Sequence, residues 1–248
     1  MVVPVLILSY NAVKLLPRCI VSIQSQDVET KLFVIENGSS DGSDKHLQAM
    51  GINHFVSKVN LGVTQGWNIG LNKLFGEGHS HVCVLNQDTV LPPYFIRELL
   101  AFDVPLVTGY PVETEEEIGP ATMGKEEERR NAGLTPHPCF SAFLLSRDCW
   151  DTVGEFDPAM MNWASDCDYH VRGHRFGVGM WKSMVPFWHH AGTTLRTSTG
   201  ATKERMTQRA NLDRAEFKKK WGCEPGEPAY DDLFAPEKFG IDRVHETM

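Results

Sequence analysis

The sequence predicts an α/β fold with a mostly parallel central sheet that is covered by helices on both faces. Apolar runs of strand length alternate with helical patterns in the first half of the chain, beginning with residues 3–8 and 16–23. Polar loops rich in turn-forming residues follow the first strands, as at residues 36–43. This alternation and its spacing indicate strand–helix–strand units with right-handed crossovers.

Composition and charge narrow the class of protein. The chain has 248 residues, 42% of them hydrophobic, and a formal net charge of −8. That length suits one large α/β domain or two small ones, and the acidic balance argues against nucleic acid as a partner. The apolar run at residues 2–8 is too short to span a membrane and reads as a first strand. Six cysteines without CxxC or zinc-like spacing favour a reduced, cytoplasmic compartment.

The elements of the first half follow from hydrophobic periodicity. Strands are expected at residues 3–8, 31–35, 52–59 and 81–85, the third being the weakest. Helices are expected over 16–23, from about residue 44, and around 67–74. Pro17 falls in the first turn of the first helix, where a missing N–H costs nothing.

The second half is less regular. A helix at 93–102 and strands at 105–110, 140–145 and 178–185 are expected, the last strand ending at Pro186. Residues 112–130 hold seven glutamates with little apolar periodicity, which favours a solvated loop, with a functional lid as the alternative. Asp166 and Asp168 stand just ahead of an apparent helix, and a basic amphipathic helix over about 203–221 is capped by Gly222.

One stretch carries the strongest chemical signal. The strand at 81–85 runs into a polar turn whose only charge is Asp88, and Pro92 and Pro93 follow soon after. A carboxylate at the C-terminal end of a central strand lies where open α/β sheets bind ligands. We therefore expect Asp88 to hold a divalent metal ion on a nucleotide diphosphate.

Six short motifs stand along the chain: Ser9–Asn11, 36–42, Asn60–Gly62 with Asn68–Gly70, Asn86–Asp88, Gly154–Asp157 and Ser165–Asp168. They occur in the order found in glycosyltransferase family 2, and over about residues 3–192 the chain resembles that family. The resemblance implies the GT-A fold, a Rossmann-like sheet flanked by helices with a smaller acceptor-side β element. It implies a single domain over 1–222, with a nucleotide-binding half at about 1–110, an acceptor-binding half at about 111–222, and a tail at 223–248.

The activity implied by the resemblance is inverting transfer of a sugar from a nucleoside-diphosphate sugar to an acceptor hydroxyl. Polar groups for the base, ribose and diphosphate would come from Ser9, Tyr10, Asn11, Glu36, Asn37, Asp41, Gly62, Asn68, Asn86 and Gln87. Glu36 stands where the family usually has Asp, so the base stays open. The sequence from Asn86 to Thr89 resembles the motif of many rhamnosyltransferases, which adds a dTDP-linked donor to a UDP-linked one. The acceptor, whether glycan, lipid-linked sugar or protein, also stays open.

The metal would be Mn²⁺ or Mg²⁺. Asp88 aligns with the acidic metal motif of the family, and Asn86 replaces its first acid. One carboxylate is enough when phosphates and water supply the other ligands. His189 or His190 resembles the histidine that some relatives add to the metal; we favour His190 between them, and imidazole suits Mn²⁺ better than Mg²⁺.

Asp166 aligns with the general base of the family, which takes the proton of the acceptor hydroxyl during in-line attack on the anomeric carbon. Asp168 caps or orients the helix or lies on the acceptor side. Trp163 and Trp188 either stack on a sugar or fill the core. Arg196 or Lys203, from a flexible segment at 193–203, would close over the leaving group.

Two other classes remain open. A nucleotidyltransferase would carry a Gly-rich, basic loop after the first strand, and residues 9–13 form no such loop. A non-catalytic descendant that binds nucleotide sugars or glycans is the stronger alternative, because Asn86 and Ser165 each replace a family carboxylate.

Overall fold

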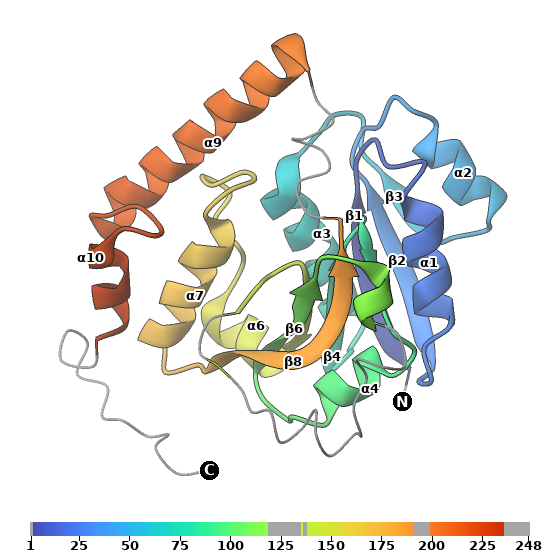
Figure 1. Cartoon of the computed structure of the whole chain (residues 1–248), viewed down its shortest axis with the longest axis horizontal. Coiled ribbons are helices and arrows are strands. Elements are labelled where there is room, and N and C mark those ends of the chain that lie inside the picture. The colour runs from blue at the N-terminus through green and yellow to red at the C-terminus, as the bar shows by residue number, and fades with distance from the viewer. Residues whose placement is uncertain (1, 119–134, 136–137, 191–198, 236–248) are drawn as a thin grey trace.

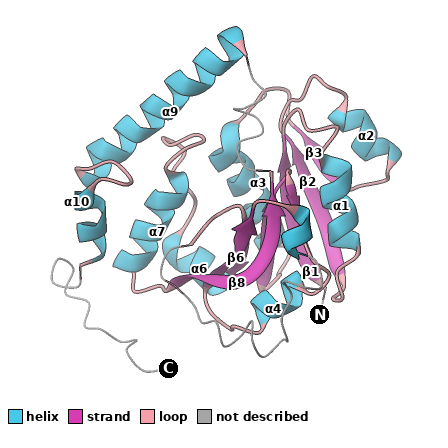
Figure 2. Cartoon of the chain, in the orientation of Figure 1, coloured by secondary structure: helices cyan, strands magenta, loops and turns pink. Residues whose placement is uncertain are grey.

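A computed structural model describes residues 2–118, 135, 138–190 and 199–235. This part of the chain forms one curled sheet with helices on both faces (Figures 1 and 2). The sheet has eight strands in the order β3-β2-β1-β4-β7-β6-β8-β5. Within the described residues, no helix is long and apolar enough to cross a membrane.

The first half forms the parallel part of the sheet, as the sequence predicts. Strands β1 (Val3–Ser9), β2 (Thr30–Glu36), β3 (His54–Val56) and β4 (His81–Asn86) pair in parallel. The helices between them are α1 (Leu16–Gln24), α2 (Ser43–Ala49) and α3 (Gly62–Gly76). Only β3 is clearly shorter than the pattern suggests.

The second half adds a mixed part to the same sheet. β7 (Ala142–Ser146) runs antiparallel between β4 and β6 (Leu106–Val112). β8 (Met180–His189) runs parallel to β6, and the short β5 (Thr89–Val90) pairs antiparallel with its end. The remaining elements are α4 (Phe95–Leu100), η1 (Glu115–Ile118), α6 (Arg147–Val153), α7 (Ser165–Arg175), α9 (Gly200–Trp221), α10 (Pro228–Asp231) and η2 (Asp232–Phe234).

Two details of the second half correct the sequence-based expectation. Pro186 does not end its strand, because β8 continues through it to His189. The β6–β8 register shifts between Thr108 and Tyr110, just where Tyr110 pairs with Pro186, and such an irregularity tolerates a residue without an N–H. Asp166 and Asp168 lie within the first turn of α7 rather than ahead of it.

Each face of the sheet buries its own apolar cluster. Alternate residues of β1 point to opposite faces, so Val5 and Ile7 pack with α1 and α4, whereas Leu6 and Leu8 pack with α3 and α6. A third, smaller cluster lies away from the sheet between α7, α9 and η2, and it contains Val171, Phe217 and Leu233. Figure 1 shows α9 running along the outer side of α7. Helix α7 is therefore packed between the sheet and α9.

Gly38 lies at a close backbone approach that fixes the loop after β2. Its φ is +75°, and an added Cβ would come within 2.6 Å of the Val59 carbonyl carbon. Gly51 has a similar φ of +67° with no atom within 4 Å of an added Cβ.

We predict that Gly38→Ala destabilises the fold more than Gly51→Ala. Both substitutions carry the left-handed backbone cost of roughly 1–2 kcal/mol, and Gly38→Ala adds an overpacking cost of about 1–3 kcal/mol. Urea unfolding of the two variants measures the difference. Equal free energies of unfolding would show that the loop relaxes without cost.

Candidate functional site

The loops that follow β1 and β4 are joined by one side chain. The Oε1 atom of Gln87 accepts from the Tyr10 N–H at 2.5 Å, and its Nε2 donates to the Tyr10 carbonyl at 3.1 Å. Because parallel strands end at the same edge of the sheet, this bond holds the two loops side by side. The side-chain amide of Gln87 is therefore hydrogen-bonded within the protein. The side-chain amide of Asn86, in contrast, makes no hydrogen bond within the described residues.

The loops after β1 and β2 are joined as well. The Asn11 N–H donates to Ser39 Oγ at 2.9 Å, and Asn11 Oδ1 accepts from the Ser40 N–H at 2.9 Å. Asp41 accepts from the Val13 N–H and from both the N–H and hydroxyl of Ser43. Partial burial alone would raise the pKa of Asp41, but these hydrogen bonds outweigh it and hold that pKa below its usual value. Asp41 is ionised in a loop that it organises.

Other residues predicted to contact the nucleotide have structural partners. The buried Glu36 carboxylate accepts from the N–H groups of Gly38 and Ser39 at 3.2 and 3.0 Å. The Asn37 amide donates to Asn60 Oδ1 and the Gly62 carbonyl and accepts from the Leu61 N–H. Ser9 Oγ is buried and has no hydrogen-bond partner among the residues that the structure describes. Glu36 and Asn37 therefore hold the backbone of the loops after β2 and β3 in place, and a contact with a nucleotide would come in addition.

Gly62 and Asn68 connect α3 to the segment between α6 and α7. Gly62 has φ +81°, and an added Cβ would come within 2.2 Å of the Met161 side chain. Asn68 forms two hydrogen bonds with the backbone of Phe156, donating to its carbonyl at 2.8 Å and accepting from its N–H at 2.9 Å. Both residues thus hold the segment between α6 and α7 against α3. Their nucleotide-binding roles stay predictions.

Asp88 faces His189 across the β5–β8 pair. Asp88 Oδ1 lies 3.3 Å from His189 Nε2, and both side chains are largely buried, at 12% and 14% exposure. The Asp88 carbonyl accepts from the His190 N–H at 3.0 Å, which fixes the register. The His190 ring is exposed and stacks on Trp188, with ring centroids 5.4 Å apart. The geometry therefore brings His189, rather than the preferred His190, to the carboxylate.

The donor set at this position suits a divalent cation. In an octahedral ion with ligand distances of about 2.1 Å, neighbouring ligand atoms lie roughly 3 Å apart, close to the observed separation of 3.3 Å between Asp88 Oδ1 and His189 Nε2. The described residues contain no group of three or more His, Cys, Asp or Glu that could hold a metal by themselves. Any ion here would need further ligands from a substrate and water.

Asp166 lies at the start of α7 behind a strained residue. Ala164, at the N-cap, adopts φ 61°, a left-handed conformation that is costly for a residue other than glycine. Within the described residues, Asp166 accepts one hydrogen bond, from the Cys167 N–H at 2.9 Å. Burial, together with the neighbouring Asp166 charge, raises the pKa of the Cys167 thiol to about 12. That thiol is therefore protonated at neutral pH.

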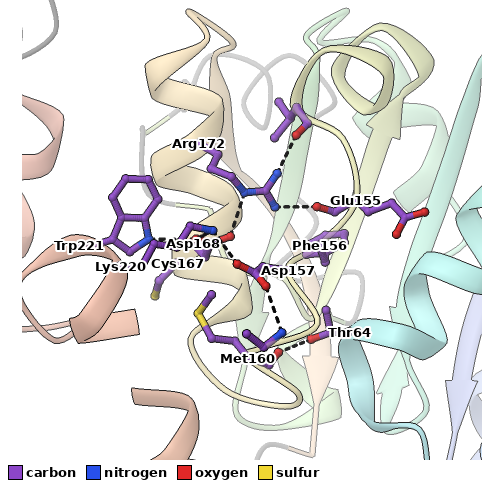
Figure 3. Close-up of polar contacts among 12 residues, drawn as sticks. Thr64, Glu155, Phe156, Asp157, Met160, Cys167, Asp168, Arg172, Lys220 and Trp221 are labelled. Atoms are coloured by element: carbon purple, nitrogen blue, oxygen red, sulfur yellow. Dashed lines mark hydrogen bonds and ion pairs between the residues drawn. The ribbon is translucent and has the colours of Figure 1, made fainter. Parts of the chain in front are cut away.

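Asp168 is buried within a network of charges, shown in Figure 3. It accepts from Arg172 Nε at 2.8 Å, from Trp221 Nε1 at 2.9 Å and from Lys220 Nζ at 2.8 Å. Arg172 also donates to the carbonyls of Val153 and Glu155. Asp168 thus links α7 to the end of α9 and to the segment before α7, and this favours its helix-orienting role over direct acceptor contact.

The same network holds Asp157. Lys220 Nζ lies 2.6 Å from Asp157 Oδ2, and the Ala159 N–H donates to Oδ1 at 3.0 Å. Burial would raise the pKa of Asp157, but these contacts outweigh it and the pKa lies below its usual value. The carboxylate is therefore charged and anchored.

Trp163 and Trp188 differ in their surroundings. The Trp163 N–H donates to Asp213 on α9. The Trp188 indole donates to the Glu113 carbonyl at 3.1 Å, and the Arg18 guanidinium lies over its ring. Of the residues expected to close over the leaving group, Arg196 lies outside the described residues and Lys203 is exposed in the first turn of α9.

The buried Asp213 was not identified from the sequence. It lies within the basic run of α9, and the only local signal is its i,i+4 spacing from Arg209. That spacing identifies an ion pair but not the loop that the carboxylate binds.

Comparisons with known proteins agree on the architecture. Residues 5–104 match the family described as Glycosyl transferase family 2. The structure superposes on glucosyl-3-phosphoglycerate synthase from Mycobacterium tuberculosis, bound to Mn²⁺, UDP and glucosyl-3-phosphoglycerate, with a TM-score of 0.60, 12% identity, and coverage of 90% of this chain and 81% of that one. The fold is the GT-A fold of glycosyltransferases.

Two further similarities define how far the likeness extends. Staphylococcus aureus TarS 1–349 bound to UDP has a TM-score of 0.57 and 15% identity, covering 99% of this chain and 74% of that one; a longer TarS structure is covered to 44%. Uncharacterized proteins of Mycobacterium tuberculosis and Mycobacterium bovis are 28% identical over 144 residues, or 54% of this chain. The chain spans about half the length of those curated relatives (55%).

We predict that Asp168→Ala destabilises the GT-A fold strongly, by about 3–5 kcal/mol, because it leaves Arg172 and Lys220 without their buried partner. The control is Glu77→Ala, which removes surface contacts with Lys73, Lys31 and His79 and costs about 1 kcal/mol or less. Urea unfolding gives both values. Similar small losses would mean that water replaces the Asp168 contacts.

Proposed function

We propose that the protein is an inverting, metal-dependent glycosyltransferase that transfers a sugar from a nucleoside-diphosphate sugar to an acceptor hydroxyl. The observation that carries this proposal is the pairing of Asp88 with His189 at the carboxyl edge of a GT-A sheet. The match of residues 5–104 to glycosyl transferase family 2 covers β1 to α4 and so includes Asp88.

The donor is a UDP- or dTDP-linked sugar. Support for a uridine base comes from similar structures that hold UDP or UDP-GlcNAc, although another similar structure, a mannosyltransferase, holds GDP-Man and Mn²⁺. Gln87, Asn37 and Asn68 use their side-chain amides within the fold. The Asn86 side-chain amide, Tyr10 and the backbone of the loop edge would therefore meet the donor beside them. Acceptors are a glycan, a lipid-linked sugar or a protein.

Asp88 and His189 would hold Mn²⁺ or Mg²⁺ together with the donor diphosphate. Bound there, the ion supplies charge stabilisation to the departing diphosphate. An imidazole beside one carboxylate favours Mn²⁺, and both metals occur in similar structures with UDP. The His190 N–H holds the backbone at the edge of this site in register through its hydrogen bond to the Asp88 carbonyl.

Asp166 is the proposed general base. Its carboxylate accepts the proton of the acceptor hydroxyl while that oxygen forms a bond to the anomeric carbon and the bond to the diphosphate oxygen breaks. Attack opposite the leaving group inverts the anomeric centre. Asp166 lies in the first turn of α7, where the Cys167 N–H donates to its Oδ1, and Oδ2 is the oxygen that we assign to this task.

A non-catalytic nucleotide-sugar or glycan binder is the second candidate. It is favoured by Asn86 and Ser165 in place of two family carboxylates. Turnover separates the two candidates, because a binder would hold the donor without hydrolysing it. The cytoplasmic location stays a prediction.

We predict that Asp166→Asn leaves donor binding within about twofold but lowers turnover by roughly 10²–10⁴-fold, the usual contribution of a general base. A thermal-shift screen of UDP-, dTDP- and GDP-sugars with Mn²⁺ identifies the donor first, since ligand binding raises apparent stability. Release of nucleoside diphosphate from that donor then gives kcat and KM. Wild-type turnover by Asp166→Asn would place the base elsewhere, and donor binding without turnover by the wild type would favour the binder.

We further predict that His189→Ala weakens Mn²⁺-dependent donor binding by about 10- to 100-fold, whereas His190→Ala changes it by less than about threefold. The reason is that His189 Nε2 lies 3.3 Å from Asp88 Oδ1, whereas the His190 ring stacks on Trp188. Calorimetric titration of the nucleoside diphosphate with and without Mn²⁺ measures both. Asp88→Ala is the reference for complete loss of the metal dependence. An equal loss in the two histidine variants would refute the assignment to His189.

A further inference from the structure

A single buried carboxylate on α9 holds three successive backbone groups ahead of α7. Asp213 is fully buried. Its Oδ1 accepts from the Met161 N–H at 2.9 Å, and its Oδ2 accepts from the N–H groups of Asn162 and Trp163 at 3.0 and 3.1 Å. Three N–H donors converging on one carboxylate define the path of residues 161–163.

Arg209, one turn earlier on α9, balances this charge. Its Nε and one Nη donate to Asp213 Oδ1 at 2.8 and 2.5 Å, and that Nη also donates to the Ala159 carbonyl at 3.1 Å. The buried charge is thus paired and hydrogen-bonded, the condition under which such a group is tolerated. Arg209 and Asp213 together clamp residues 159–163 to α9.

The opposite side of this segment is held by the start of α3. Thr64 Oγ1 donates to the Met160 carbonyl at 2.5 Å, a contact drawn in Figure 3, and the Thr64 N–H donates to the Met161 carbonyl at 3.1 Å. The Val63 N–H donates to Asn162 Oδ1 at 3.1 Å. Residues 160–162 are therefore fixed from two directions, by α3 and by α9.

The clamped segment leads directly into α7. Ala164 follows in its left-handed conformation, and Asp166 is two residues further on. A strained residue persists only where its surroundings over-determine it, and the bonds to residues 161–163 are the adjacent restraint. The direction in which α7 starts, and with it the Asp166 carboxylate, depends on this restraint.

We propose that Asp213 is a positioning residue that sets the location of Asp166 by holding residues 161–163 in place. The inference rests on the proposed function, in which Asp166 is the general base. Asp168 differs, because the side chains that contact it come from α7 and α9 rather than from the segment 161–163.

Hydrogen–deuterium exchange of the full chain tests the structural half without any substrate. Asp213→Asn keeps the shape but has only one accepting oxygen for three N–H groups, so exchange in peptides covering 157–168 should rise at least about tenfold. Peptides of β1 and β4 should be unchanged. Thr64→Val, which removes the Thr64 hydroxyl contacts with the Met160 and Met161 carbonyls on the α3 side, is the second variant if Asp213→Asn does not fold, and it should raise exchange in the same peptides.

Steady-state kinetics test the effect of Asp213 on turnover. The substrate is the donor that the thermal-shift screen identifies, or else UDP-glucose, whose hydrolysis is followed in the presence of Mn²⁺. Asp213→Asn should lower kcat by about 10- to 100-fold, the size of effect expected when a catalytic group is displaced by about 1 Å. Donor KM should stay within about twofold. Leu99→Ala, a core truncation in the distant helix α4, is the stability-matched control and should keep kcat when assayed well below its Tm.

A double-mutant cycle decides whether Asp213 acts through Asp166. If it does, Asp166→Asn lowers kcat much less in the Asp213→Asn background than in the wild type. Additive losses, a normal kcat for Asp213→Asn, or unchanged exchange at 157–168 would each overturn the inference while leaving the proposed function intact. Wild-type turnover by Asp166→Asn alone would overturn the base assignment, and this inference with it.

Discussion

The segment from Gly154 to Ala164 depends on hydrogen bonds between side chains and backbone, because it has no regular secondary structure to satisfy its own polar groups. Asn68 and Thr64 bind it from α3, and Asp213 binds it from α9. Each anchor is buried, where an unpaired backbone group would cost free energy. Helix α7 starts directly after this segment, so contacts made by other elements bear on the position of Asp166.

Two buried carboxylates on neighbouring helices serve different ends. Asp168 is surrounded by Arg172, Lys220 and the Trp221 indole. Most of the electrostatic attraction in this group is offset by the cost of removing the charges of Asp168, Arg172 and Lys220 from water. Asp213 accepts from one guanidinium and from three backbone N–H groups, for which it is the acceptor among the described residues. The contacts of Asp168 join helices α7 and α9, and the contacts of Asp213 hold residues 161–163 in one conformation.

The sequence could predict what depends on local pattern and could not predict what depends on long-range partners. The alternation of strands and helices up to residue 102, and the place of Asp88 after β4, follow from hydrophobic period and turn chemistry. The choice between His189 and His190 required the β5–β8 register, because adjacent strand residues point to opposite faces. Asp213 and Asn68 bind backbone more than 50 positions away, which spacing within their own helices cannot show.

These contacts also join the two halves of the proposed site. The start of α3, which follows the Asn60–Gly62 loop on the nucleotide side, itself bonds to Met160, Met161 and Asn162. The separation between the donor loops and Asp166 is therefore set by direct hydrogen bonds across a packed junction. In-line displacement demands that base, acceptor oxygen, anomeric carbon and leaving oxygen be aligned within a fraction of an ångström. A junction of short, buried bonds meets that demand better than a hinge between mobile halves, since packed contacts deform little.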